Sequence, residues 1–297
     1  MNSRVITNSG IFFLKILSLF PFWLIYLISD FFYFLICYVI RYRKNVIINN
    51  LKKAFPEKPD KERRRIMNLF YRYFSDLLME SIKMRGMKEK DFRERFKVKN
   101  PELLNQYLDI GKSVILLTMH YSNWEWGTRL SLYQKYKFLA VYKPLHNMEF
   151  DRYMIKTRST EGNELIKNSQ ILRRLYKHKK KEGPVMIGLV GDQTPPSFHT
   201  SWYQFLNQEA IFYPGPASLS KQFNLPIFFY YAEKNARGKY TLSFETLIDN
   251  PEEMSETDII KTYIRKMEEV IKQRPEYYLW SHKRWKHRRP ANKPLHG

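Results

Sequence analysis

The chain has 297 residues, of which 44% are hydrophobic and 16% aromatic, so it holds enough apolar material for one large α/β domain with an accessory segment. Lys and Arg outnumber Asp and Glu by 51 to 29, and the net charge of +22 predicts an anionic partner: nucleic acid, an anionic membrane surface or an acidic carrier protein. The single cysteine, Cys37, excludes a disulfide within the chain and gives no support to a thiolate metal site.

The first forty residues are strongly apolar, with Lys15 and Asp30 as the only charged residues between positions 11 and 40. As a helix, residues 16–40 would extend about 37 Å at roughly 1.5 Å per residue, against a hydrocarbon core of about 30 Å. That length permits one tilted membrane span. Pro21 and the central Asp30 disfavour a span, so two short helices in the membrane interface remain the alternative.

Basic residues follow this apolar segment at Arg41, Arg43 and Lys44, and positive charges beside a membrane segment stay on the cytoplasmic side. No small-residue cleavage site follows, which argues against a signal peptide that is removed. We therefore predict a membrane anchor over residues 1–45, with the following chain on the cytoplasmic face.

Beyond the anchor, helical and strand patterns alternate. Helices are expected at 61–84, 101–110, 124–136, 148–161, 170–182, 215–223 and 257–273. Strands are expected at 113–119, 138–142, 185–190, 226–232 and 240–246. The alternation predicts an α/β fold with a central, mostly parallel mixed sheet flanked by helices, in which the last two strands are candidates for an antiparallel pair.

The expected strand at 113–119 ends at His120, and Glu125 follows five positions later. Strand ends are where ligands meet an α/β fold, and an imidazole with a carboxylate in reach can act as a general base. On a continuous helix the two side chains would lie about 140° apart. Residues 122–123 are good N-caps, so a strand–turn–helix would bring them together. The spacing alone leaves open that Glu125 merely favours the helix dipole.

A second carboxylate, Asp192, follows the expected strand at 185–190, although ordinary turn chemistry explains it as well. Arg158 lies in a basic helical stretch, where solvated charge is the default interpretation. The sequence has no Gly-rich phosphate loop, His/Cys metal cluster or Gly-x-Ser-x-Gly elbow, so we expect no nucleotide, metal, cofactor or serine nucleophile. Three other histidines are expected on basic surface: His178, His282 and His287.

Taken together, these segments resemble the late acyltransferases of lipid A biosynthesis, the lauroyl/myristoyl transferase family, within the wider His-x4-Asp/Glu lysophospholipid acyltransferases. The resembling stretches lie at 46–84, 116–127 (LLTMHYSNWEWG), 141–166, 188–195 (GLVGDQTP) and 275–288 (PEYYLWSHKRWKHR). The chain departs from the family pattern between residues 202 and 217, a region expected to shape the acyl or acceptor pocket.

The resemblance implies transfer of a fatty acyl chain from acyl carrier protein, or from coenzyme A, to a hydroxyl of a lipid A precursor. The same chemistry would serve a lysophospholipid or an amino-acid-containing lyso-lipid. The resemblance also implies that His120 is the general base and that Glu125 hydrogen-bonds its other ring nitrogen. We expect four further residues in the substrate site: Arg158, Asp192, Asn123 and Gln193. Arg158 would bind phosphate or the oxyanion, and Asp192 would orient Arg158 or the acceptor.

In this interpretation the anchor is followed by an acyltransferase domain over 46–297, with a helical lead-in (46–100), an α/β core (101–280) and a basic tail (281–297). The partners would be acyl carrier protein as the acyl donor, a membrane lipid acceptor and the anionic inner membrane. The rival hypothesis is a non-catalytic nucleic-acid binder that uses the basic clusters. The apolar first forty residues argue against it, and no nucleic acid is expected.

Overall fold

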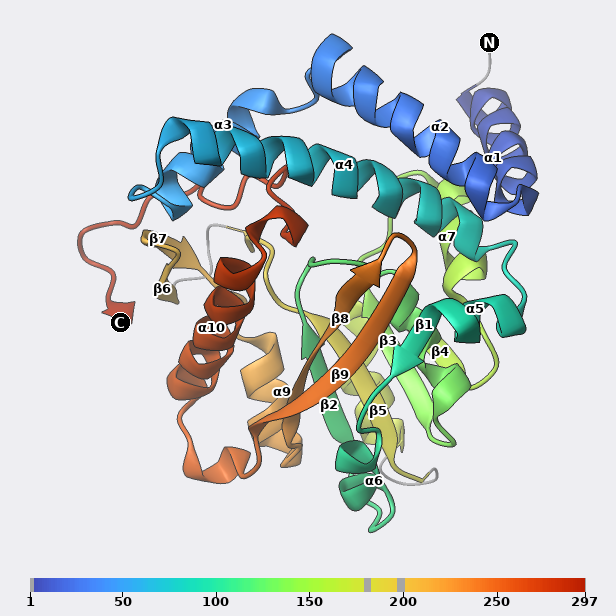
Figure 1. The fold of residues 1–297 in the computed structure, drawn as a ribbon. Coiled ribbons are helices and arrows are strands. Elements are labelled where there is room, and N and C mark those ends of the chain that lie inside the picture. The colour runs from blue at the N-terminus through green and yellow to red at the C-terminus, as the bar shows by residue number, and fades with distance from the viewer. Residues whose placement is uncertain (1–2, 179–182, 197–200, 297) are drawn as a thin grey trace.

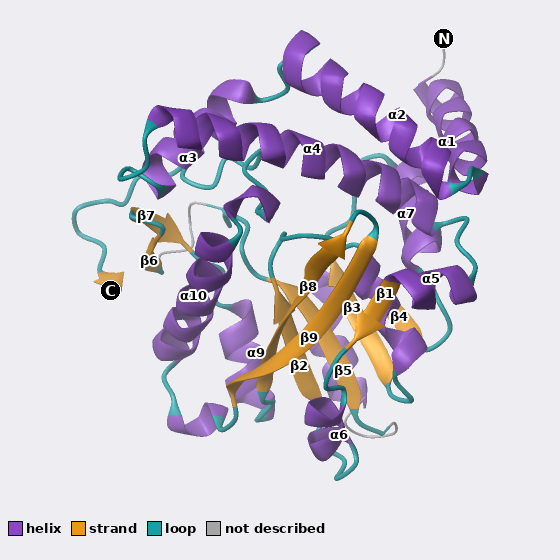
Figure 2. Cartoon of the chain, in the orientation of Figure 1, coloured by secondary structure: helices purple, strands orange, loops and turns teal. Residues whose placement is uncertain are grey.

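The computed structural model describes residues 3–178, 183–196 and 201–296. The large sheet contains β1 (Phe96–Val98), β2 (Val114–Thr118), β3 (Lys137–Tyr142), β4 (Asn163–Lys167), β5 (Val185–Val190), β8 (Ile227–Ala236) and β9 (Lys239–Ile248). The strand order is β1-β9-β8-β2-β5-β3-β4, in which β8, β2, β5, β3 and β4 run parallel and β9 is antiparallel to β8. The predicted α/β fold with a mostly parallel mixed sheet, including the antiparallel last pair, is confirmed (Figure 2).

Helices surround this sheet and also cover one of its ends (Figure 1). The α-helices are α1 (Ser3–Leu19), α2 (Phe22–Phe34), α3 (Lys44–Ala54), α4 (Asp60–Met84), α5 (Glu89–Arg95), α6 (Glu102–Leu108), α7 (Met148–Arg158), α8 (Ile171–His178), α9 (Gly215–Phe223) and α10 (Glu256–Gln273). A π-helical turn, Leu35–Val39, continues α2. The long α4 runs across the end of the sheet where the parallel strands finish, and α2 lies on the outer side of α4 (Figure 1).

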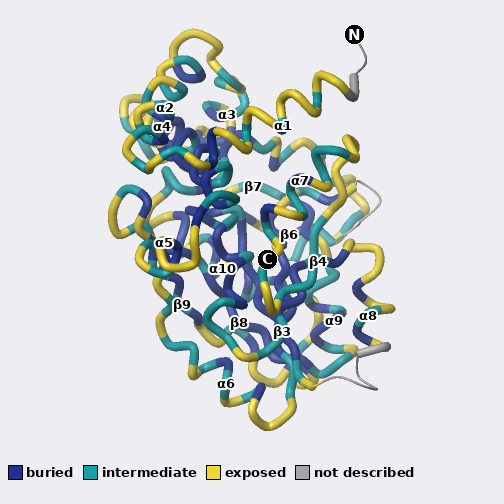
Figure 3. The backbone as a smooth tube through the Cα atoms, turned by 90° about the vertical axis from the view of Figure 1, so that its right-hand side faces the viewer, coloured by how far each residue is buried: buried dark blue, intermediate teal, exposed yellow. Residues whose placement is uncertain are grey.

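Strand β2 lies in the middle of the sheet and is buried along its whole length. Ile115 and Leu117 join the apolar core on the α10 side, whereas Val114 and Leu116 join the core that contains Trp126. A continuous apolar run of this kind is typical of a parallel strand covered on both faces. In Figure 3 the buried, dark-blue backbone accordingly lies in the middle of the molecule, around β3 and β8.

Several elements differ from the prediction. The expected helix at 124–136 is a 3₁₀ helix, Trp126–Tyr133, with a kink at Arg129. The short edge strands β1 and β4 were not predicted. The divergent stretch forms β6 (Trp202–Phe205) and β7 (Gln208–Ile211), an antiparallel pair that joins β10 (Leu295–His296) in a second small sheet. The expected helix at 170–182 is observed as α8, and residues 179–182 lie outside the described residues.

A charged network attaches α2 to the rest of the molecule. Arg237, in the β8–β9 turn, contacts both Asp30 of α2 and Asp76 of α4 at 2.7 Å. Ser29 donates to Asp76 at 2.8 Å. The neighbouring Gly238 has φ of +67°, and a Cβ there would lie 1.7 Å from the hydroxyl oxygen of Tyr26 in α2, so the tight approach requires glycine.

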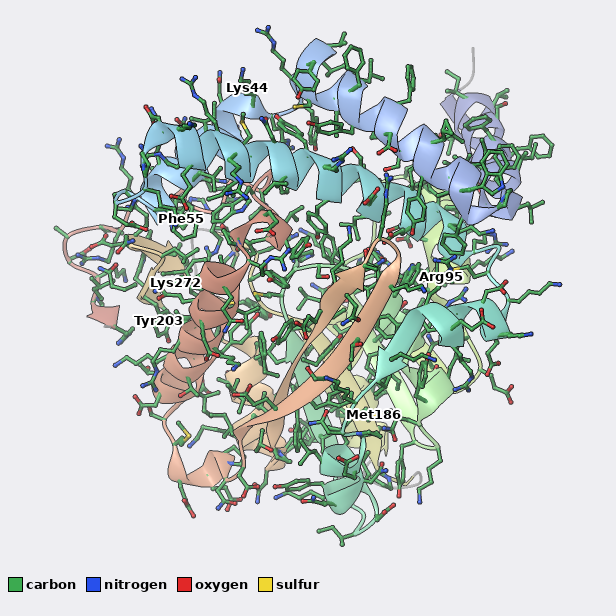
Figure 4. All side chains as sticks on the ribbon, viewed as in Figure 1. Lys44, Phe55, Arg95, Met186, Tyr203 and Lys272 are labelled. Atoms are coloured by element: carbon green, nitrogen blue, oxygen red, sulfur yellow. The ribbon has the colours of Figure 1, made fainter. Side chains whose placement is uncertain are left out.

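The tip of the β8–β9 hairpin is thus enclosed on two sides. Arg95, labelled in Figure 4, donates to the Gly238 carbonyl at 3.3 Å.

Among the described residues, one helical segment, Phe22–Val39, is long and apolar enough to cross a membrane. Its Asp30, which the sequence presents as a cost to membrane insertion, is paired with Arg237 in the fold.

Candidate active site

The central feature of the site is a hydrogen bond between two side chains that follow neighbouring parallel strands. Thr118, the last residue of β2, is opposite Val190, the last residue of β5. His120 and Asp192 each lie two residues beyond this pair, so the register brings them together at the carboxyl edge of the sheet. The Nδ1 atom of His120 lies 2.7 Å from Oδ1 of Asp192.

The predicted hydrogen bond between Glu125 and His120 is wrong, because the carboxylate on the imidazole belongs to Asp192. Glu125 instead accepts two hydrogen bonds from Arg158, from Nε at 2.9 Å and from Nη2 at 2.7 Å. The assignment of Asp192 to orienting Arg158 is therefore also corrected. A guanidinium held in this bidentate way has two donors fewer for phosphate or an oxyanion.

This arrangement fixes the tautomer of His120. Since Asp192 can only accept a hydrogen bond when ionised, Nδ1 carries the proton and Nε2 carries a lone pair. The Gln193 amide nitrogen lies 3.1 Å from Nε2 and donates to it. The Trp124 ring stands edge-on to the imidazole, with ring centroids 5.1 Å apart. The basic nitrogen thus faces a neutral amide that an incoming hydroxyl can replace.

The charges around His120 favour its protonated form. Burial and the charge of Arg158 act to lower the pKa of His120, but the charge and hydrogen bond of Asp192 and the charge of Glu125 together outweigh them. The pKa of His120 is therefore raised. Burial acts to raise the pKa of Asp192, yet the charge and hydrogen bond of His120 hold it below its usual range. Asp192 remains a carboxylate and His120 a strengthened base.

A pocket of about 360 Å³ opens beside the imidazole. Its lining residues come from the start of the α3 region, α4, the loop after β2, the loop after β5 and the tail: Tyr42, Arg43, Phe74, His120, Trp124, Glu125, Gln193, Leu279, Ser281 and His282. The predicted residues His120, Glu125 and Gln193 therefore meet at one cavity. None of the described residues between 202 and 217 lines it, contrary to the expectation for that stretch. Within the described chain, no group of three His, Cys, Asp or Glu side chains is arranged to hold a metal ion.

Asn123, expected in the substrate site, is fully buried and supports the loop after β2. Its amide donates to Glu80 of α4 at 2.7 Å, and its side-chain oxygen accepts from the Trp126 N–H at 3.1 Å. Both polar ends are thus engaged inside the protein. The predicted N-cap role is wrong at this position, because the 3₁₀ helix begins at Trp126 and its N-cap is Glu125.

Glu80 is a buried carboxylate that the sequence analysis did not single out. It accepts hydrogen bonds from Tyr26 at 3.0 Å, Tyr240 at 2.7 Å and Asn123 at 2.7 Å. Burial raises the pKa of Glu80 to about 7. Its place on the buried face of α4, three residues after Leu77 and four before Met84, was the available signal, since a carboxylate there must find partners inside the fold.

Residues 278–282, which lead into the basic tail, contact the loop after β2 and line the pocket. The Leu279 N–H donates to the His120 carbonyl at 3.1 Å, and Tyr121 and Tyr278 form an antiparallel bridge. The expectation that His282 belongs to basic surface is wrong, because its side chain lines the pocket. Nothing local distinguishes His282 in the sequence, since it lies among basic residues.

The fold and this geometry define an α/β protein with a histidine–carboxylate centre at a strand end, of the kind that activates a hydroxyl group. Over residues 1–287 the chain matches the family described as bacterial lipid A biosynthesis acyltransferase, and it belongs to that family of acyltransferases. No curated protein matches the chain.

Proposed function

We propose that the chain transfers a fatty acyl group from a carrier-protein thioester to a hydroxyl of a lipid A precursor, with His120 as the general base. The observation that carries the proposal is the His120–Asp192 hydrogen bond of 2.7 Å beside an open pocket. Family membership supports the acyl transfer. The net charge of +22 suits both an acidic carrier protein and a phosphorylated lipid.

The proposed reaction is a direct transfer. The acceptor hydroxyl displaces the Gln193 amide from Nε2 of His120 and gives its proton to that nitrogen as its oxygen attacks the thioester carbonyl. A carbon–oxygen bond forms and the carbonyl electrons move onto oxygen. When the oxyanion collapses, the carbon–sulfur bond breaks and the thiolate takes the proton from the imidazolium. Asp192 stabilises the imidazolium between these two steps.

A panel assay with the purified full chain tests this function. The donors are acyl thioesters of graded chain length on acyl carrier protein and on coenzyme A. The acceptors are a tetraacylated lipid A precursor, a lysophospholipid and an amino-acid-containing lyso-lipid. We expect the precursor with a carrier-protein donor to react fastest, as read by mass spectrometry of the product. Faster turnover of a lyso-lipid would overturn the acceptor assignment, and absence of transfer from every pair would overturn the function.

We further propose that the chain acts while lying on a membrane surface. Along α2 and the π turn, the exposed side chains fall three or four residues apart on one helical face: Trp23, Leu27, Phe31, Phe34 and Tyr38. The opposite face is tied to α4 and Arg237. A helix held along its length with an apolar outer face fits the plane of the interface better than a transverse span.

The route from this face to the pocket is short. Tyr42 and Arg43, which line the proposed catalytic pocket, lie three and four residues after the end of the π turn Leu35–Val39. Arg43 also borders a second pocket of about 470 Å³ together with Arg41 and Lys44. Each basic side chain near an anionic leaflet adds about 1 kcal/mol of attraction. A lipid hydroxyl would therefore reach His120 from the bilayer edge.

Vesicle binding tests this docking. Replacing Trp23 and Phe31, each 67% exposed, by serine should weaken binding to anionic vesicles by about 10²-fold or more, because burying each such side chain contributes roughly 1.5–3 kcal/mol. The matched control is Ile110→Ser, which removes a 77% exposed side chain beside α6, at the far end of the molecule from α2 (Figure 1). Equal loss in both variants, or no loss in the first, would contradict the assigned face.

A further inference from the structure

We infer that His282 is a second catalytic imidazole, whose Nδ1–H donates a hydrogen bond to the oxyanion formed when the thioester carbonyl is attacked. This role depends on the acyl transfer proposed above and adds a residue to its site. His282 lines the same pocket as His120 and Glu125, although it belongs to the basic tail. The role requires a fixed ring, a proton on Nδ1 and a neutral charge state.

The position of the proton follows from the neighbours of the ring. The Thr194 backbone N–H donates to Nε2 of His282 at 3.2 Å. A nitrogen that accepts a hydrogen bond carries the lone pair, so the neutral ring has its proton on Nδ1. Within the described part of the chain, no residue accepts a hydrogen bond from that Nδ1. The Nδ1–H group of His282 is therefore available to donate a hydrogen bond to a bound group.

The ring is also neutral. Burial lowers the pKa of His282 to about 4; the charge of Asp192 opposes this effect, and the charges of Arg284 and His120 reinforce it. A neutral imidazole can donate to an oxyanion without competing with His120 for the hydroxyl proton. The two histidines of the pocket thus have their pKa values moved in opposite directions, which separates a base from a hydrogen-bond donor.

The backbone that carries His282 is held firmly. The Asn50 amide donates at 2.8 Å to the carbonyls of both Trp280 and His282. Arg43 donates to the Ser281 carbonyl at 2.9 Å. Donors fixed before the reaction stabilise developing charge without reorganisation, which is the main advantage of an oxyanion hole.

Arg158, which the sequence analysis assigned to the oxyanion, is engaged elsewhere. It gives Nε and Nη2 to Glu125. The Gln193 amide donates to His120 until the acceptor hydroxyl displaces it. We therefore assign the oxyanion to His282 and not to Arg158.

Three substitutions at this position separate an oxyanion donor from a structural role. In His282→Asn the amide lies near the place of Nδ1, whereas in His282→Gln it reaches toward Nε2. His282→Ala removes both. We expect Ala and Gln to lower kcat by about 10²–10³-fold with little change in KM, and Asn to restore part of kcat. Lys283→Ala, an exposed neighbour in the tail, is the control and should keep the wild-type kcat.

The readout is kcat and KM from steady-state transfer by the purified full chain, with the donor and acceptor that the panel assay identifies. Unchanged kcat in Ala and Gln, a rise in KM alone, or equal losses in Asn and Gln at equal melting temperature would overturn the role of His282. If Ala does not fold, the comparison of Asn with Gln decides. An inactive wild type would instead contradict the proposed function, so the two failures are distinct.

Discussion

The His120→Ala variant is expected to lose acyl transfer by about 10²–10⁴-fold, the contribution of a positioned general base. The reason is that Nε2 of His120 carries the lone pair that accepts the hydroxyl proton, because the hydrogen bond to Asp192 keeps the ring proton on Nδ1. The measurement is transfer rate by the purified chain at saturating donor and acceptor. Since the loss is one of chemistry, KM and vesicle binding should stay near the wild-type values.

The control for this variant is His146→Ala, which removes an exposed histidine in the loop before α7. It should keep wild-type transfer and wild-type melting temperature. The His120 side chain is 18% exposed and packs edge-on to Trp124, so His120→Gln provides a second, better-filled variant. Substantial transfer by both His120 variants would remove the base from the mechanism.

The positions of His120 and Asp192 were both predictable from the sequence, but their pairing was not. His120 was found because an apolar run ended at an imidazole, and Asp192 was placed at the same edge for the same reason. What the sequence could not supply was the strand order. Only the adjacency of β2 and β5, with Thr118 opposite Val190, brings two residues 72 positions apart within 2.7 Å. Nearness in sequence favoured Glu125 as the hydrogen-bond partner of His120, but in the fold Glu125 accepts from Arg158.

The same limit explains the other errors. The apolar β2 and β5 and the amphipathic α4 and α10 were predictable from their residue patterns, because burial on one or both faces dictates their residues. Strand β4, with the sequence NELIK, carries charges because it lies at a sheet edge, and nothing local marks it as a strand. His282 and Glu80 contact the site through hydrogen bonds to Thr194 and Asn123, residues far from them in the sequence, and composition does not reveal such contacts.

The N-terminal segment shows how tertiary contacts change the meaning of a charge. In the sequence, Asp30 weakens the case for a membrane span. In the fold, Asp30 pairs with Arg237, which also holds Asp76, so the charge lies on the side of α2 that faces α4. The apolar side chains on the other face are left exposed. Of the two arrangements that the sequence left open, this geometry favours helices in the interface.

Replacing the carboxylate of the proposed catalytic pair, Asp192, should have the largest effect of any isosteric change. Asp192→Asn keeps the size of the side chain but no longer requires a proton on Nδ1 of His120, since an amide can donate to that nitrogen. The matching change in a Ser-His-Asp triad costs about 10⁴-fold in kcat through the wrong tautomer. We expect a loss of that order, measured as single-turnover transfer at the pH optimum.

The residual activity of Asp192→Asn should also change its pH dependence. Protonated His120 cannot act as a base, so transfer is lost as pH falls through its pKa, and a raised pKa places this acid limb above the ordinary histidine value of about 6.5. Removing the Asp192 charge lowers the pKa of His120 and must move the limb to lower pH. Glu125→Gln, which removes the weaker of the two charges, should move the limb less. A limb that stays in place in Asp192→Asn, or moves further in Glu125→Gln, would mean that the carboxylate controlling His120 is not Asp192.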